Sequence, residues 1–137
     1  FSFETDYSPL SGKCDRIDLD ENGNISIVDY KTSKSAKTER ELKKDIQIGI
    51  YALFMLLHGV NTAENKNIKK IPDKLSMLFL REDEPEVTVE FTHSDLDNFE
   101  ERLRGISEGI RKGEFSACKG KYCEWCDYRD LLCPEFG

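Results

Sequence analysis

Residues 12–31, GKCDRIDLDENGNISIVDYK, constrain the fold more than any other stretch of this 137-residue chain. Apolar and polar residues alternate on both sides of an Asp-Glu-Asn-Gly segment, and alternation with a period of two predicts β-strands. Asp20 at the first turn position and Gly23, which accepts a positive φ angle, are typical of a tight turn. The sequence therefore predicts an antiparallel hairpin with one largely apolar face.

The register of this hairpin depends on the length of its loop. A three-residue loop over 21–23 pairs Asp20 with Asn24 and places Asp15 directly opposite Asp29. A two-residue Asn-Gly loop would shift the pairing by one residue, and the three-residue loop is preferred because it segregates the side chains cleanly. One face then carries apolar residues near the turn and charges at the open end: Asp15, Ile17, Leu19, Ile25, Ile27, Asp29 and Lys31.

Asp15 and Asp29 interrupt this apolar face. Opposed residues of an antiparallel pair have Cβ atoms about 4.5–5.5 Å apart, so two inward-facing carboxylates repel each other and are costly to bury unpaired. A divalent cation relieves the conflict, because Mg²⁺ binds carboxylate oxygens together with water and substrate phosphate. Lys31, on the same face, can meet a phosphate charge or orient a water molecule. A plain salt bridge between Lys31 and the two acids is the competing interpretation.

Strands and helices follow one another along the rest of the chain. The patterns predict a strand within Phe1–Tyr7, a helix from Glu39 to about His58, strands over 75–80 and 86–91, and a helix starting near Ser94. The first helix carries the apolar stripe Leu42, Ile46, Ile50, Leu53, Phe54 and Leu57, and the second carries Leu96, Phe99, Leu103, Ile106 and Ile110. This order favours an α/β (α+β) fold with a mixed sheet and a cysteine-rich C-terminal tail.

Three motifs occur in order along the first third of the chain: Gly12-x-x-Asp15, then Val-Asp29-Tyr-Lys31-Thr, then Gln47-x-x-x-Tyr51. Together they resemble the PD-(D/E)XK nuclease superfamily, and within it the RecB-like nuclease domains of helicase–nuclease and CRISPR-associated proteins. The resemblance implies a restriction-endonuclease-like core, a mixed central sheet flanked by helices. That core begins with a helix which precedes the first residue here, so we expect an excised domain that starts after it.

The resemblance also implies roles for the motif residues. Asp15 and Asp29 would be metal ligands, Lys31 the catalytic lysine, and Gln47 and Tyr51 would support DNA positioning and the active site. The implied reaction is phosphodiester hydrolysis with Mg²⁺ or Mn²⁺, in which a metal-bound water attacks in line and the cation neutralises the developing charge.

Four of the five cysteines lie close together in the tail, as Cys118-x4-Cys123-x2-Cys126-x6-Cys133. No secretory signal is recognisable, so this spacing favours a thiolate-bound metal over disulfides; four thiols packed as small apolar groups are the competing interpretation. Residues 123–134 resemble the C-terminal signature of iron–sulfur RecB-like domains, which implies a 4Fe–4S cluster, and zinc remains the alternative. The fourth ligand would be Cys118 or a cysteine upstream of this chain, while Cys14 is expected to be a packed thiol.

We therefore expect a single RecB-like nuclease domain over 1–137, with 114–137 as the metal-binding tail. The expected function is Mg²⁺- or Mn²⁺-dependent DNA hydrolysis, with exonuclease action favoured, in a cytoplasmic recombination, repair or defence protein that has DNA and a helicase as partners. The alternatives are a non-catalytic DNA- or helicase-binding module of the same fold and a zinc-ribbon-like interaction protein. The net charge of −7 argues weakly against nucleic acid, yet residues 31–44 hold six basic side chains against two acidic ones. No apolar run approaches the roughly 20 residues of a membrane span.

Overall fold

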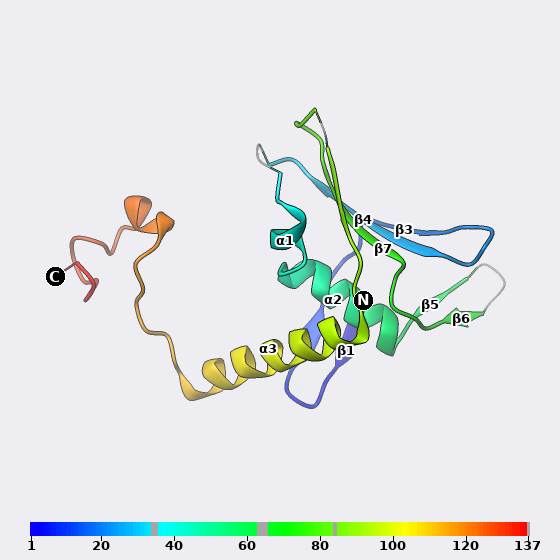
Figure 1. The fold of residues 1–137 in the computed structure, drawn as a ribbon. Helices are drawn as coiled ribbons and strands as arrows, with labels where there is room; N and C mark the ends of the chain where they lie inside the picture. Colours follow the sequence, from blue (N-terminus) through cyan, green and yellow to red (C-terminus); the bar gives the residue numbers. More distant parts are fainter. Residues whose placement is uncertain (34–35, 63–65, 84, 137) are drawn as a thin grey trace. The chain divides into compact units, whose positions relative to one another are not determined.

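The computed structural model describes residues 1–33, 36–62, 66–83 and 85–136 (Figure 1). Contacts between Cα atoms divide the chain into two compact units, residues 1–104 (unit 1) and residues 105–137 (unit 2). Lys34, one of the six basic residues of the 31–44 segment, lies outside the described residues. Along the described chain, no helix combines the length and the hydrophobicity that crossing a membrane requires.

A four-stranded mixed sheet forms the centre of unit 1 (Figure 1). Its strands, in spatial order, are β3 (Arg16–Leu19), β4 (Ile25–Lys31), β7 (Lys74–Phe79) and β8 (Glu86–Val89). The β4–β7 pair is parallel, whereas β3–β4 and β7–β8 are antiparallel. Two small antiparallel pairs join β1 (Ser2–Glu4) with β2 (Pro9–Ser11) and β5 (Val60–Asn61) with β6 (Asn67–Ile68). The predicted mixed α/β fold is confirmed, although the sequence patterns did not reveal β2, β5 and β6.

The β3–β4 hairpin has the predicted three-residue loop. Leu19 pairs with Ile25 across the ladder, and the Asp20 amide donates a 3.0 Å hydrogen bond to the carbonyl of Asn24. Gly23 has a φ angle of 82°, a left-handed conformation that glycine adopts without steric cost. Extending this register by one residue beyond β3 places Asp15 opposite Asp29, as the sequence predicts.

The predicted continuous helix over 39–58 is wrong, because the chain forms two helices, α1 (Glu39–Leu42) and α2 (Ile46–Leu57). Asp45 separates them: its Oδ1 accepts the amide hydrogens of Gln47 and Ile48 and so caps the start of α2.

The last long helix, α3 (His93–Lys112), also starts differently from the prediction. Thr92 and Asp95 exchange side-chain and backbone hydrogen bonds at its first turn, so the cap is Thr92 and not Ser94.

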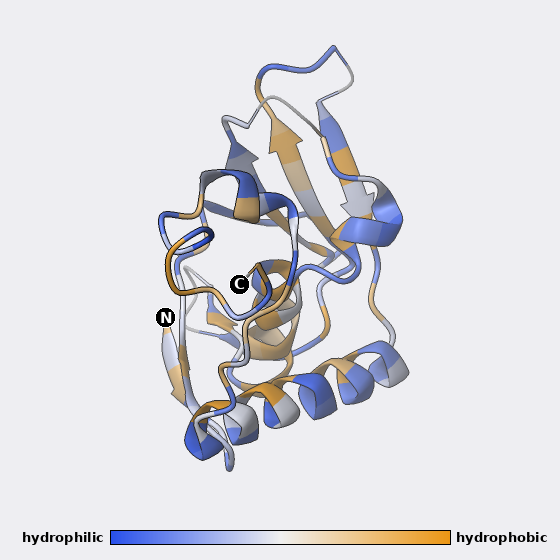
Figure 2. Ribbon diagram, turned by 90° about the vertical axis from the view of Figure 1, so that its left-hand side faces the viewer, coloured by the Kyte–Doolittle hydropathy of each residue, from blue (hydrophilic) through white to orange (hydrophobic). Residues whose placement is uncertain are grey.

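The core of unit 1 lies between the sheet and α2. Alternate residues of β4 and β7 face the helix and are fully buried, and Figure 2 shows hydrophobic residues over most of α2. Ile17 and Leu19 on edge strand β3 were expected to share this burial, but they are 37% and 47% exposed because the helix covers the central strands only. The buried residues of this core form one hydrophobic cluster: Ile25, Ile27, Leu42, Ile48, Tyr51, Ala52, Met55, Leu75, Met77, Phe79, Val89, Phe91 and Leu96.

The opposite side of α2 packs against β1 and the first half of α3 in a second cluster that includes Phe3, Leu53 and Phe99. Gly49 permits this approach, because a Cβ atom there would lie 2.4 Å from the ring of Phe99. Contacts on two sides explain why the predicted stripe of α2 is only partly right. Ile46 and Leu57 are each 40% exposed, whereas residues between the expected stripe positions are buried.

Unit 2 holds the end of α3 and the cysteine-rich tail, which contains one short 3₁₀ helix, η1 (Lys121–Trp125). Within this unit, backbone hydrogen bonds join neighbouring turns, for example from Cys133 to the carbonyl of Tyr128 at 2.9 Å. Ile106 and Ile110, predicted to face the core, are 41% and 58% exposed. Large apolar side chains of the tail are exposed as well: Phe115, Tyr122, Trp125, Tyr128, Leu131 and Leu132.

Candidate functional site

The carboxyl end of β4 brings a carboxylate and an amine to the face that α2 covers. Asp29 and Lys31 are two residues apart, so their side chains point to the same side of the sheet. Asp29 is only 2% exposed, and Lys31 Nζ lies 2.6 Å from its Oδ2. This ion pair neutralises a carboxylate that would be costly to bury alone.

Gln47, in the first turn of α2, connects the groups of this site. Its Oε1 accepts a 2.6 Å hydrogen bond from Lys31 Nζ, while its Nε2 donates to Asp29 Oδ1 at 2.9 Å. The same Nε2 donates to the hydroxyl of Tyr51 at 2.6 Å. One amide therefore fixes the positions of the lysine, the aspartate and the tyrosine.

Tyr51 lies one helical turn beyond Gln47 and is 1% exposed. Its hydroxyl is 2.7 Å from the carbonyl of Lys13 and 3.1 Å from Asp29 Oδ1, so its single proton can be donated to either acceptor. Burial raises the pKa of Tyr51 well above its usual value, so the hydroxyl remains a hydrogen-bond donor at neutral pH. Tyr51 thus joins α2 to the segment that leads into β3.

Asp15 lies directly before β3 and is exposed, so only Asp29 meets the expectation of two buried carboxylates. Its Oδ2 accepts a 3.0 Å hydrogen bond from the amide of Tyr30, the residue next to Asp29. The Asp15 side chain thus extends the β3–β4 pairing by one hydrogen bond just before β3 begins. The neighbouring Cys14 is a partly buried thiol packed against the core, as expected, and burial raises its pKa to about 11.

Asp15 and Asp29 have the chemistry of a Mg²⁺ site. Asp29 Oδ2 is buried and accepts no hydrogen bond from the described residues; its partner there is the Lys31 ammonium, which contacts it as an ion pair. Mg²⁺ commonly takes one or two carboxylates and completes its coordination with water and substrate phosphate. The absence of any group of three or more His, Cys, Asp and Glu ligands among the described residues is therefore compatible with Mg²⁺.

Asp45 and Lys37 belong to the site but were not predicted from the sequence. The Asp45 Oδ2 atom forms an ion pair with Lys37, while its Oδ1 caps the turn that carries Gln47. Burial opposes ionisation of Asp45, but the hydrogen bond and charge of Lys37, together with the amides of Gln47 and Ile48, outweigh it, so the pKa of Asp45 is lowered. An Asp before an apolar helical run is a recognisable capping signal, and it was hidden by the expectation of one continuous helix.

The four tail cysteines are all free thiols. Cys123 Sγ accepts a hydrogen bond from the amide of Gly120 at 3.2 Å, and Cys118 and Cys126 are exposed. Within the described part of the tail these thiols are not gathered into a group that could hold a metal ion. In this arrangement they do not form the expected cluster site.

Comparison with known proteins agrees with the geometry of unit 1. The family model of the PD-(D/E)XK nuclease superfamily matches residues 1–134, nearly the whole chain. A search of curated proteins gives no significant match. The mixed sheet, the acid–lysine pair on β4 and the Gln47–Tyr51 pair on α2 lie within the matched residues, and the chain belongs to the PD-(D/E)XK nuclease superfamily.

Proposed function

We propose that residues 1–137 form a single metal-dependent DNA nuclease domain, with Asp15, Asp29, Lys31, Gln47 and Tyr51 as its active site. The observation that carries the proposal is the network around Gln47, which holds Lys31 Nζ 2.6 Å from a buried carboxylate oxygen. Burying an acid, an amine and an amide in one network is costly unless every group is satisfied, so such a network favours a functional role over a structural one.

Asp15 and Asp29 would hold Mg²⁺ or Mn²⁺, an ion that acidifies a bound water and neutralises charge on the phosphate when it is present. Lys31 carries a positive charge beside that position and can bind a non-bridging phosphate oxygen. Gln47 fixes the Lys31 ammonium and Asp29 relative to each other, and Tyr51 fixes Gln47. The chain thus supplies a preorganised charge arrangement for phosphodiester hydrolysis.

Cleavage of labelled single- and double-stranded DNA with Mg²⁺, Mn²⁺ or EDTA tests the proposal. We expect metal-dependent cleavage that falls about 10²–10³-fold in Lys31→Ala, the usual loss when one stabilising group is removed. Lys31→Ala also removes the ion pair of Asp29. Lys31→Arg is therefore the second variant, because it keeps the positive charge but changes the geometry of the cationic group.

Lys74→Ala is the matched control for this experiment. Lys74 pairs with Ser26 at the opposite end of β4 and should not affect cleavage. Equal turnover of the wild-type, Lys31→Ala and Lys31→Arg proteins would refute the assigned role of Lys31.

A non-catalytic DNA-binding module is the second candidate, and the exposure of Asp15 favours it. Asp15 Oδ2 is already bonded to the Tyr30 amide, which leaves Asp29 as the one buried carboxylate of the pair. DNA binding that persists in EDTA, with no cleavage under any metal, would identify this function.

The finer assignments rest on the motif resemblance. We propose exonuclease action in a RecB-like domain that serves recombination, repair or defence beside a helicase. A circular and a linear DNA of the same sequence separate the modes of action, because an exonuclease degrades only the linear molecule.

The tail cysteines Cys118, Cys123, Cys126 and Cys133 are proposed to bind a 4Fe–4S cluster, with Zn²⁺ as the alternative. Their support is the spacing of four free thiols within one unit. Metal analysis of an anaerobic preparation, with its visible spectrum, distinguishes the two. Cys126→Ser should lower the bound metal, and an unchanged metal content would remove this assignment.

A further inference from the structure

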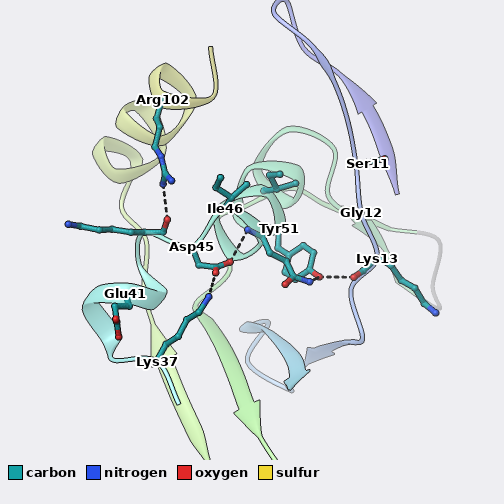
Figure 3. A pocket seen from close by; sticks show the side chains of 12 residues that line it. Ser11, Gly12, Lys13, Lys37, Glu41, Asp45, Ile46, Tyr51 and Arg102 are labelled. Carbon is teal, nitrogen blue, oxygen red and sulfur yellow. Dashed lines mark hydrogen bonds and ion pairs between the residues drawn. The ribbon is translucent and has the colours of Figure 1, made fainter. Parts of the chain in front are cut away.

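A cleft of about 680 Å³ opens beside the Gln47 network (Figure 3). Gln47 and Tyr51 belong to its lining, so the cleft is continuous with the candidate active site. Its other walls come from the segment before β3, from the α1–α2 connection and from α3. Apart from Gln47 and Tyr51, the lining residues are Ser11, Gly12, Lys13, Lys37, Glu41, Lys44, Asp45, Ile46, Ile50 and Arg102.

The cleft has an excess of positive charge, although the whole chain carries −7. Its acid Asp45 is already neutralised by Lys37, and Glu41 hydrogen-bonds the capping residue of α1. Within the described ranges, neither Lys13 nor Lys44 forms an ion pair with a carboxylate. Arg102 likewise has no such partner there, so three cationic side chains remain to attract an anion from solution.

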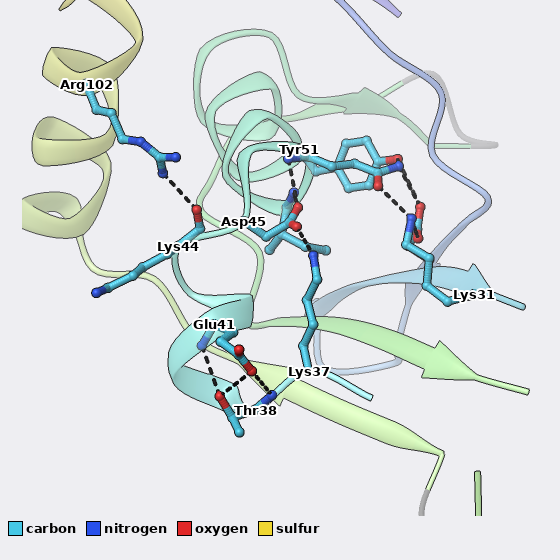
Figure 4. Close-up of polar contacts among 11 residues, drawn as sticks. Lys31, Lys37, Thr38, Glu41, Lys44, Asp45, Tyr51 and Arg102 are labelled. Carbon is cyan, nitrogen blue, oxygen red and sulfur yellow. Dashed lines mark hydrogen bonds and ion pairs between the residues drawn. The ribbon is translucent and has the colours of Figure 1, made fainter. Parts of the chain in front are cut away.

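A hydrogen bond to the backbone holds the Arg102 side chain in place. Its NH1 donates a 2.7 Å hydrogen bond to the backbone carbonyl of Lys44, which ties α3 to the α1–α2 connection (Figure 4). A guanidinium has five N–H donors in a planar fork, so one anchoring bond leaves donors for a phosphate. Because the anchor lowers the entropy lost on binding, Arg102 is a better phosphate ligand than a freely rotating side chain.

A second cleft of about 330 Å³ shares Lys44 and Arg102 with the first and adds Arg40 and Lys43. Lys43 pairs with Asp95 at 3.1 Å, while Arg40 has no carboxylate partner in the described part of the chain. The cationic lining therefore continues away from Gln47 past Lys44 and Arg102. Several cations that line two adjoining clefts fit a polyanion better than a single small anion.

We propose that Lys13, Lys44 and Arg102 bind successive phosphates of one DNA strand next to the scissile phosphodiester, as positioning residues of the active site. The choice of DNA rests on the proposed function, whereas the choice of a polyanion rests on the charges of the cleft. These contacts go to the backbone alone, so binding is expected to be strong at low salt and independent of base sequence.

Fluorescence anisotropy with labelled oligo(dT) in EDTA tests this proposal, because binding is then measured without cleavage. Each variant Lys13→Ala, Lys44→Ala and Arg102→Gln should raise the Kd severalfold. Each should also reduce the slope of log K against log salt by about 0.7, the value for one lost phosphate contact on a single strand. The triple variant should therefore lose about 2 units of slope.

Lys74→Ala serves again as the matched control, since it removes one exposed lysine from the opposite end of β4. The proposal is overturned if the triple variant keeps the Kd and slope of this control, or if the wild-type protein does not bind the oligonucleotide. Failure of the proposed function has a different signature. Cleavage would be absent, while binding would still depend on Lys13, Lys44 and Arg102.

Discussion

Tyr51→Phe removes one oxygen atom from the centre of the Gln47 network and leaves the packing of the ring unchanged. The lost hydroxyl accepts from Gln47 Nε2 at 2.6 Å and lies within donating distance of the Lys13 carbonyl and Asp29 Oδ1. Since the ring is buried between the sheet and α2, water cannot readily replace these partners. The substitution therefore isolates the energetic value of the network.

The size of the stability loss follows from the hydrogen bonds and ion pairs that each partner of the hydroxyl keeps. Asp29 keeps its bond from Gln47 and its ion pair with Lys31, so it is not left unpaired. The Lys13 carbonyl loses the tyrosine hydroxyl, and Gln47 Nε2 loses one acceptor. Two hydrogen bonds at about 1 kcal/mol each give a loss of about 2 kcal/mol in the free energy of unfolding.

Urea denaturation measures this loss. With an m-value of about 2 kcal/mol/M, the midpoint should fall by about 1 M without a change in m. Tyr122→Phe, which removes the same atom from an exposed tyrosine, is the control and should leave the midpoint unchanged. The double variant Tyr51→Phe/Gln47→Ala should lose less unfolding free energy than the sum of the two single variants, because both changes break the same hydrogen bond. A midpoint equal to that of the wild-type protein, or strict additivity, would refute the coupling.

Three further predictions concern positions around this network. Asp45→Ala should cost about 1 kcal/mol of stability through the lost cap; because Lys37 lowers the pKa of Asp45, this stability is present above about pH 4 and is lost below it. Urea midpoints of the two proteins should therefore converge in acid, and a difference that persists there would contradict the prediction. Gly49→Ala should cost about 1–3 kcal/mol by overpacking against Phe99, and Phe99→Leu should reduce that cost in the double variant if the clash is its cause. Because burial raises the pKa of Cys14 to about 11, the unfolded thiol ionises first, so stability should fall between about pH 9 and 11. Cys14→Ser should weaken this fall in urea midpoints, and an identical pH profile would refute it.

The hairpin and the strands of the mixed sheet were predictable because they depend on local patterns. The roles of the motif residues rest on the family resemblance and stay a prediction. The turn chemistry at Asp20 and Gly23 fixed the loop, and the loop fixed the register that sets Asp15 opposite Asp29. The apolar run at 75–80 and the alternation at 86–91 likewise located β7 and β8 to within a few residues.

Burial was less predictable, since it depends on where α2 lies across the sheet. The same alternation occurs on β3 and β4, yet Ile27 is buried whereas Ile17 is exposed on the edge strand. The cationic cleft could not be predicted from the sequence either, because Arg102 and Lys44 meet only through the packing of α3. The break between α1 and α2 could have been recognised at Asp45, had its capping role been weighed against the apolar period.

The Gln47 network has a kinetic consequence for the folding of the chain. All of its members lie between Lys13 and Tyr51, so the network needs only the docking of α2 on the β3–β4 hairpin. Loops of this length close early in folding, whereas pairing with β7 and packing of α3 join residues much further apart. We therefore expect the geometry of the Gln47 network to form ahead of the second core cluster. Hydrogen exchange during refolding would then protect the first turn of α2 before α3.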